Sequence, residues 1–197
     1  MTDFLTVVSG LPRSGTSMMM AALQAGGLPL VVDGVREADR HNPRGYFEHE
    51  GIKTLQDGGE WLNEHKGKAI KILFHLVKWI PDEVPIKVIL MLRQLEEVVQ
   101  SQDLMLARRP TQKTDWARLF GTQLEKLRSQ LQQRENVQVL EVRYAAVLLD
   151  PDREFARVAD FLQLPLEVSG MAATVDPTLY RNRLGAEVPT WTPATPD

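Results

Sequence analysis

The chain of 197 residues contains no cysteine, so the sequence excludes a disulfide framework and a thiolate metal site. No apolar run approaches the roughly 20 residues that a membrane span requires. The first residues, Met1-Thr2-Asp3, lack the basic region of a signal peptide. A net charge of −3 offers no electrostatic attraction for nucleic acid or an anionic membrane. We therefore expect a cytoplasmic protein that binds neither nucleic acid nor membranes.

A hydrophobic content of 43% and a charged content of 25% are ordinary for a globular protein. Apolar runs alternate with helical patterns, which predicts an α/β fold of the P-loop type, with a mostly parallel central sheet between two layers of helices. The length favours a single domain, which we place at residues 1–185. Residues 186–197 carry Pro189, Pro193 and Pro196 without a periodic apolar face, which predicts a flexible tail.

The apolar patterns predict strands near residues 4–9, 69–74, 86–92 and 137–142, and helices near 16–25, 50–57, 95–107, 114–134 and 152–162. The helix over 114–134 is the clearest, because its apolar residues recur at spacings of four and three and form one stripe for core packing. Thr114 is predicted to cap this helix, with Asp115 in its first turn. The stripe consists of Trp116, Phe120, Leu124, Leu127 and Leu131.

A glycine-bounded loop stands between the first predicted strand and the first predicted helix. Gly10 and Gly15 have the spacing of the phosphate-binding loop GxxxxGK[ST], but Thr16 occupies the lysine position and Arg13 is the cation of the loop. Backbone N–H groups and the helix dipole at such a loop favour an anion. Because the loop lysine normally reaches the β- and γ-phosphates, its loss argues against a nucleoside triphosphatase.

A second anion site is predicted after the strand near 86–92. A P-loop triphosphatase normally carries an aspartate there to organise the metal, whereas this chain has Arg93, followed eight residues later by Ser101 on a predicted helix. An arginine fork and a hydroxyl donor can hold a phosphate. Two anion sites without a metal aspartate suit a nucleotide that carries phosphates at two positions. Taken alone, Arg93 and Ser101 are equally compatible with a surface arginine and an ordinary helix serine.

Both sites resemble those of the sulfotransferase family, whose members use 3′-phosphoadenosine 5′-phosphosulfate (PAPS). Residues 12–17, Pro-Arg-Ser-Gly-Thr-Ser, resemble the family's 5′-phosphosulfate loop. The stretch from Leu92-Arg93 to Ser101 is similar to its 3′-phosphate motif, an arginine and a serine separated by seven residues.

Later parts of the chain extend the resemblance. Residues 143–162 are similar to a late family segment with Asp-Pro and Phe-Leu pairs, although Ala145 and Ala146 replace its usual acidic pair. Residues 42–48 and 176–183 resemble a compact bacterial branch of the family.

The resemblance implies that PAPS is the co-substrate, that PAP is its product and that no metal is required. The acceptor would be a hydroxyl or amine of a small molecule. Arg13 would stabilise charge on the leaving phosphate, Tyr144 would approach the adenine and Arg181 would complete the phosphate shell. The implied PAPS-binding residues are Pro12, Arg13, Ser14, Gly15, Thr16, Ser17, Arg93, Ser101, Tyr144 and Arg181.

A histidine with a pKa near the working pH is the usual general base for activating an acceptor. His75 follows the predicted strand over residues 69–74, as the catalytic histidine of many sulfotransferases follows a similar strand. We therefore predict His75 as the base. The alternative, which carries equal weight, is a purely structural histidine at the end of a strand, with its hydrogen bonds made inside the fold. The segment 36–49 is expected to border the acceptor, and it supplies the rival bases His41, Glu48 and His49.

Two other functions remain open at this stage. One is a nucleotide or small-molecule kinase with a degenerate loop, which Thr16 and Arg93 disfavour. The other is a non-catalytic protein that binds PAP-like nucleotides, which would differ only in lacking a working base. The sequence does not identify the acceptor, and it is compatible with a homodimer.

Overall fold

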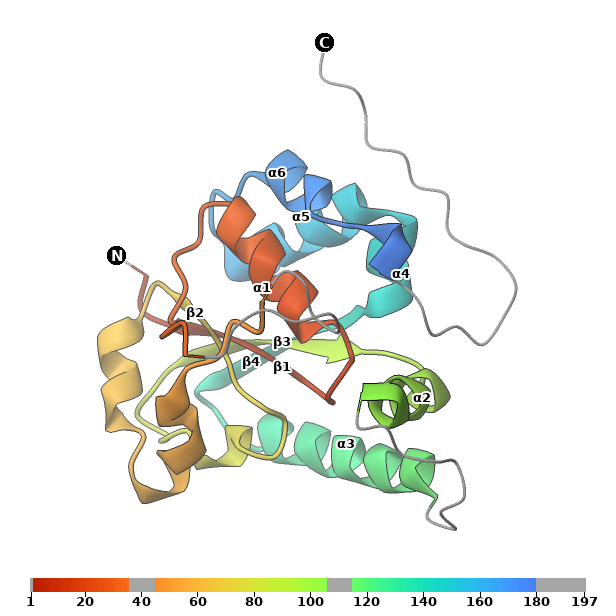
Figure 1. The fold of residues 1–197 in the computed structure, drawn as a ribbon. Helices are drawn as coiled ribbons and strands as arrows, with labels where there is room; N and C mark the ends of the chain where they lie inside the picture. The colour runs from red at the N-terminus through yellow and green to blue at the C-terminus, as the bar shows by residue number, and fades with distance from the viewer. Residues whose placement is uncertain (1, 36–44, 106–114, 180–197) are drawn as a thin grey trace.

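The computed structural model describes residues 2–35, 45–105 and 115–179. Among these residues, four strands form a sheet in the order β2-β1-β3-β4. The strands are β1 (Leu5–Gly10), β2 (Ala69–Lys71), β3 (Ile86–Leu92) and β4 (Val137–Arg143). Each pairing is parallel, and Val7 of β1 lies between Ile70 and Val88. The predicted α/β fold around a parallel sheet is therefore confirmed (Figure 1).

The sheet is the middle of three layers (Figure 1). One face packs against α1 (Thr16–Ala25), α4 (Tyr144–Leu149), α5 (Pro151–Leu162) and α6 (Val168–Ala173). The other face packs against α3 (Trp116–Gln132) and the 3₁₀ helices η1 (Glu50–Asp57) and η2 (Glu60–His65). Successive residues of a strand point to opposite faces, so Val7 and Val8 enter different cores.

The remaining helices of the described residues are α2, η3 and η4. α2 (Leu95–Met105) follows the carboxyl end of β3, at the right of Figure 1. The 3₁₀ helices η3 (Val77–Trp79) and η4 (Pro177–Leu179) are single turns. No helix in the described ranges has the length and hydropathy to cross a membrane.

The central strands are buried on both faces, as their continuous apolar runs predict. The prediction for β2 was wrong at its end, because the strand stops at Lys71 instead of residue 74. The Ile72 N–H still donates to the Val8 carbonyl at 3.0 Å, but the chain then turns, and the Leu76 N–H donates to the Leu73 carbonyl at 2.8 Å. His75 therefore lies on this turn and does not follow directly on the strand.

The helix predictions succeed where a clear local signal exists. α1 has the predicted bounds, and Phe120, Leu127 and Leu131 of the predicted stripe on α3 are buried. The cap of α3 differs from the prediction: the Asp115 carboxylate, not Thr114, accepts the Arg118 N–H at 3.0 Å. Helical positions predicted at 106–107 and Thr114 and the tail predicted at 186–197 lie outside the described residues.

Candidate functional site

The loop between β1 and α1 is tightly constrained. Its backbone adopts positive φ values at Gly10 (153°), Arg13 (67°) and Gly15 (101°). A Cβ atom on Gly10 would lie 2.5 Å from Ser14 Oγ, and one on Gly15 would lie 2.5 Å from Tyr144 Cδ2. Only glycine fits both positions without displacement of a neighbour. The spacing of the two glycines therefore reflects a packing requirement.

Polar groups of this loop suit an anion. Ser14 is fully buried, and its Oγ has no hydrogen-bond partner within the described part of the chain. No side chain from the described residues caps the N-terminus of α1, which begins directly after Gly15. Uncapped N–H groups and the helix dipole at such an end stabilise a bound phosphate.

Arg13 extends from this loop to α2. Its Nε donates a hydrogen bond to Ser101 Oγ at 3.0 Å. Ser101 lies on α2, as predicted, and only 3% of its surface is exposed. The structure thus joins the cation of the predicted 5′-phosphosulfate loop directly to the serine of the predicted 3′-phosphate motif.

Arg93 follows β3 and is held on three sides. Its Nη1 donates to the Arg13 carbonyl at 3.1 Å, and its Nε forms an ion pair with Glu97 Oε2 at 2.9 Å. Its guanidinium carbon lies 4.9 Å from the centroid of the Tyr144 ring. The Arg93 and Glu97 side chains are 8% and 3% exposed. These contacts orient the Arg93 guanidinium in the absence of a ligand.

Tyr144 contacts residues of both predicted anion sites. It is the first residue of α4 and only 7% exposed, and its ring packs on Arg93 and against Gly15. The structure therefore brings the predicted residues Arg13, Ser101, Arg93 and Tyr144 together. Arg181 lies outside the described residues.

Lys71 is a further cation of this site that the sequence-based prediction missed. Its Nζ lies 3.0 Å from Glu48 Oε1 and 3.5 Å from Ser17 Oγ, and it donates to the Tyr46 carbonyl. The Lys71 side chain is only 5% exposed. A lysine within the apolar run 69–74 was the signal available in the sequence, because a buried cation requires partners.

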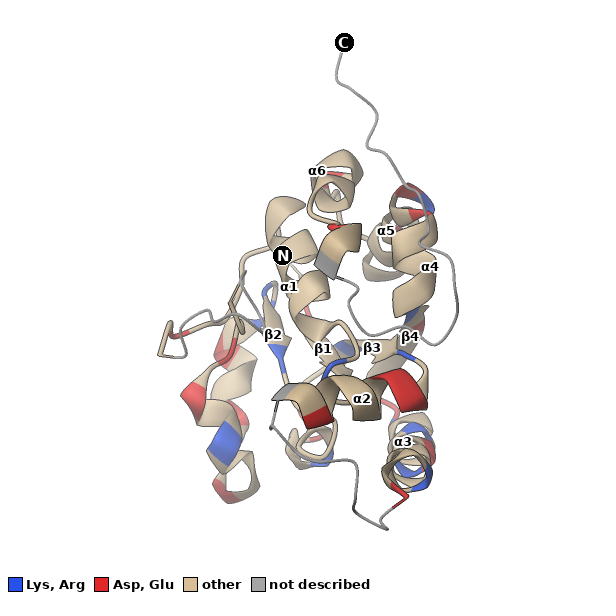
Figure 2. Ribbon diagram, turned by 45° about the vertical axis from the view of Figure 1, so that its right-hand side comes forward, with Lys and Arg blue, Asp and Glu red and all other residues tan. Residues whose placement is uncertain are grey.

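Three neighbouring strands thus end beside a cation. Lys71 is the last residue of β2, Arg13 follows β1 by three positions and Arg93 directly follows β3. The order β2-β1-β3 sets these ends side by side. Figure 2 shows basic segments where the strands end near α2. Ligands of open parallel sheets bind at this edge.

Among the candidate bases, Glu48 and His49 take different positions. Glu48 pairs with Lys71 next to α1. The His49 ring stacks on Trp61, with centroids 5.0 Å apart, and its Nδ1 accepts the Gly51 N–H at 3.1 Å. His49 therefore caps η1 and packs locally. His41 lies outside the described residues.

His75 is exposed on the turn that follows β2. Its ring packs edge-on against the Phe74 ring, with the ring centroids 5.2 Å apart. Partial burial, and to a smaller extent the charge of Lys78, lower the pKa of His75, so the imidazole is mostly neutral at pH 7. Within the described residues, no hydrogen bond links His75 to the loop between β1 and α1.

A profile of the sulfotransferase family matches residues 46–168, more than half of the chain. The chain belongs to the sulfotransferase family. The matched range contains Lys71, Arg93, Ser101 and Tyr144 and begins after the loop that contains Arg13. Membership implies a sulfonate donor as co-substrate and a small-molecule acceptor.

The alignment with one solved structure supports the fold. The sulfotransferase domain of the Synechococcus PCC 7002 olefin synthase aligns with a TM-score of 0.51 at 12% identity, over 91% of this chain and 80% of that domain. The sulfotransferase domain from the curacin biosynthetic pathway aligns with a TM-score of 0.48 at 13% identity, over 96% of this chain and 94% of that domain. A sugar kinase from Janibacter sp. HTCC2649 aligns with a TM-score of 0.42 at 16% identity, over 88% of this chain and 98% of the kinase. No curated protein matches the sequence significantly.

Proposed function

We propose that this chain transfers the sulfuryl group of PAPS to a hydroxyl or amine of a small molecule. The observation that carries the proposal is the linkage of Arg13, Ser101 and Arg93 at the ends of β1 and β3. Two cations held by hydrogen bonds at neighbouring strand ends suit a donor with anionic groups at its 5′ and 3′ positions. Family membership supports sulfuryl transfer in general.

The residues of the loop fit the 5′ end of such a donor. The buried Ser14 Oγ lacks a partner in the described residues, and the backbone of residues 13–17 leads into the uncapped start of α1. We assign Pro12, Thr16 and Ser17 to the same phosphosulfate site, because they border the loop and the first turn of α1. Arg93 and Ser101 would hold the 3′-phosphate, with Arg181 completing the shell.

PAPS, when bound, supplies the sulfuryl group. Arg13 would stabilise the charge that develops on the leaving phosphate, because it lies in the loop between β1 and α1. Lys71 Nζ, 3.5 Å from Ser17 Oγ at the start of α1, adds a second positive charge at the same edge. The hydrogen bonds that hold these cations orient them in advance, which reduces the reorganisation needed during transfer.

The acceptor also needs a base, and two residues are proposed for this role. His75 has the chemistry of a base at neutral pH, because its lowered pKa leaves the imidazole unprotonated. Glu48 has the closer link to the loop, because its carboxylate pairs with Lys71 beside Ser17. Separate variants of the two residues distinguish these roles.

Calorimetric titration with PAP, PAPS and ATP, each with and without Mg²⁺, tests the proposed donor. We expect PAP and PAPS to bind without metal and ATP to bind much more weakly, because the loop has threonine at the lysine position. Tighter binding of Mg-ATP than of PAP would instead favour a kinase. Binding of PAP without sulfuryl transfer to a broad acceptor panel would favour a nucleotide-binding protein.

A further inference from the structure

The two edges of the central sheet are finished differently. β2 is covered on its outer side: the Ala69 N–H donates to the Pro29 carbonyl and the Val31 N–H donates to the Ala69 carbonyl, both at 2.8 Å. β4, at the other edge, pairs only with β3 among the described residues. In Figure 2, β4 lies at the outer side of the row of strands, between α4 and α3. An open edge strand is a template for pairing with another chain.

The backbone of β4 alternates between its neighbour β3 and the open side. The Ile86 N–H donates to the Asn136 carbonyl at 3.0 Å, so the even-numbered residues of β4 face β3. The backbone groups of Val139 and Glu141 therefore point outward, because alternate residues of a strand bond to opposite neighbours. Within the described ranges, the N–H of neither residue donates a hydrogen bond. These outward groups are available to a further strand.

The side chains of β4 do little to block this edge. Natural edge strands are commonly protected by proline, lysine or other charged side chains, and the strand Val-Gln-Val-Leu-Glu-Val-Arg has neither proline nor lysine. Its one acid, Glu141, accepts two hydrogen bonds from Arg128 of α3, at 2.5 and 3.0 Å, which offset its charge. Val139, on the same face of the strand, is 36% exposed. The middle of the edge is therefore apolar or neutralised.

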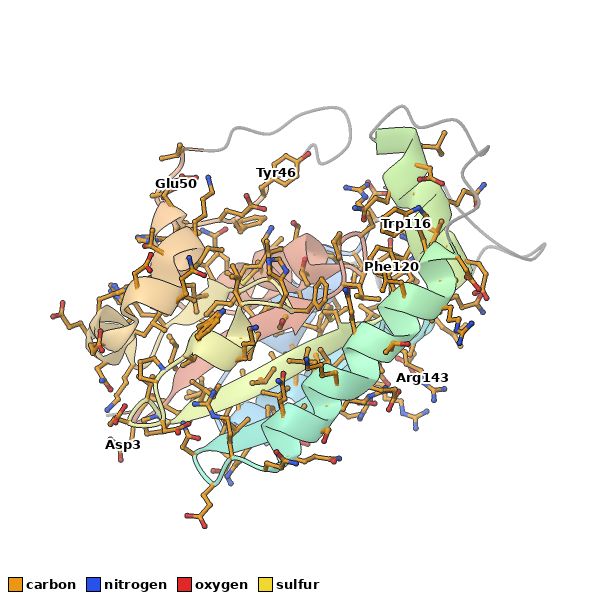
Figure 3. The ribbon with its side chains drawn as sticks, turned by 90° about the horizontal axis from the view of Figure 1, so that it is seen from below. Asp3, Tyr46, Glu50, Trp116, Phe120 and Arg143 are labelled. Atoms are coloured by element: carbon orange, nitrogen blue, oxygen red, sulfur yellow. The ribbon has the colours of Figure 1, made fainter. Side chains whose placement is uncertain are left out.

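The two ends of β4 carry opposite charges. Arg143 at the carboxyl end and Glu135 just before the amino end are both exposed, and Figure 3 shows Arg143 projecting outward beside α3. The two residues are roughly 26 Å apart along an extended chain that rises about 3.3 Å per residue, so they do not pair within one copy. In an antiparallel pair of strands with Val139 opposite its own equivalent, Glu135 of each copy falls opposite Arg143 of the other. The edge is thus complementary in charge to itself.

We propose that β4 pairs antiparallel with β4 of a second copy of this chain, so that two molecules share one continuous sheet. Val139 exchanges hydrogen bonds with its equivalent across a two-fold axis, and the Glu141 N–H donates to the Val137 carbonyl of the other copy. Arg143 of each copy pairs with Glu135 of the other. An axis one residue further along β4 would instead leave Arg143 opposite Val137. The inference is independent of the proposed function, because β4 contains none of the proposed donor-binding residues.

Analytical ultracentrifugation of the full chain over a range of concentrations tests the association, and we expect a dimer. Val139→Lys sets two cations opposite each other and should weaken the dimer about tenfold or more. Val32→Lys is the matched control, because Val32 is 42% exposed and follows Val31 at the covered edge beside β2. This control should dimerise as the parent does. A monomeric parent, or an equal loss of dimer in the two variants, would overturn the inference.

Charge reversal tests the contact between the ends of the two strands. Arg143→Glu and Glu135→Arg should each weaken the dimer severalfold, since each sets like charges opposite each other. The double variant should restore the dimer, because it exchanges the two charges. Both side chains are exposed, so these variants keep the test decisive even if Val139→Lys does not fold, and circular dichroism verifies the fold of each. A double variant as weak as the single ones would overturn the proposed pairing.

Single cysteines locate the axis, because the chain has no cysteine of its own. Val139→Cys should form a disulfide-linked dimer under mild oxidation, since the Cα atoms of opposed residues lie about 5.5 Å apart, within the range of a disulfide. Gln138→Cys, at the exposed neighbouring position, should link much more slowly, because its equivalent lies diagonally about 8 Å away. Linkage of Gln138→Cys at the same rate or faster would contradict an axis at Val139 and overturn the proposed register.

Discussion

Arg13 Nε donates a hydrogen bond to Ser101 Oγ at 3.0 Å, although the two residues are 88 positions apart in the chain. One belongs to the loop after β1 and the other to the helix after β3. Because β1 and β3 are hydrogen-bonded neighbours, these following segments meet at one edge of the sheet. A ligand that engages Ser101 therefore also acts on Arg13, which couples the two proposed phosphate sites.

Arg93→Ala should weaken the binding of PAP far more than that of adenosine 5′-phosphosulfate, which has no 3′-phosphate. Truncating one partner of a well-buried charged pair typically costs about 2–5 kcal/mol. Calorimetry with the two ligands measures the difference. Equal losses would show that Arg93 does not contact the 3′ position.

Glu97 is expected to position Arg93 and not to contact the nucleotide. Glu97→Ala leaves a buried guanidinium without its carboxylate, so PAP affinity should fall about tenfold as Arg93 loses its orientation. Glu97→Gln retains an acceptor for Arg93 Nε and removes a negative charge, so it should bind PAP at least as well as Glu97→Ala and within about threefold of the parent. The exposed neighbour Glu96 provides the control, since Glu96→Ala should leave PAP affinity unchanged. A loss in Glu97→Gln as large as that in Glu97→Ala would contradict the positioning role.

Gly15→Ala should destabilise the fold and impair PAP binding, because its Cβ would meet the Tyr144 ring at 2.5 Å. Gly27→Ala is the matched control: Gly27 also has a positive φ, 92°, but no heavy atom within 4 Å of the added Cβ. Both variants carry backbone strain of about 1–3 kcal/mol, so the difference between them isolates the contact with Tyr144. Thermal unfolding should give the lower Tm for Gly15→Ala. Equal Tm values would mean that the Tyr144 ring moves aside at little cost.

His75→Ala and Glu48→Gln separate the two proposed bases. Whichever variant removes the actual base should lower turnover about 10²–10⁴-fold. His75→Ala should leave the affinity for PAP within twofold of that of the parent. If His75 is the base, the rate falls as the pH drops through its pKa, since protonation removes the neutral imidazole. Burial lowers that pKa, so the decline should begin only below about pH 6.5, the ordinary histidine value. Full turnover in His75→Ala, with loss in Glu48→Gln, would assign the base to Glu48.

Local patterns were sufficient for several elements. The spacing of Gly10 and Gly15 and the apolar residues that follow placed the loop and the bounds of α1. The apolar run before Arg93 placed β3, because a strand buried on both faces is almost continuously apolar. The end of β2 was misjudged, since Ile72, Leu73 and Phe74 remain apolar after the strand has ended, and Ile72 and Phe74 pack against the core from the turn that follows.

The sequence by itself determined the class of fold and the types of residue at the site: a parallel sheet, a glycine-bounded loop and an arginine where a metal aspartate is usual. These features depend on residue spacing within one strand, loop or helix. The contacts of Arg13 with Ser101, of Arg93 with Tyr144 and of Lys71 with Glu48 were decided by tertiary structure. Each joins segments whose proximity depends on strand order, and local periodicity carries no information about which strands are neighbours.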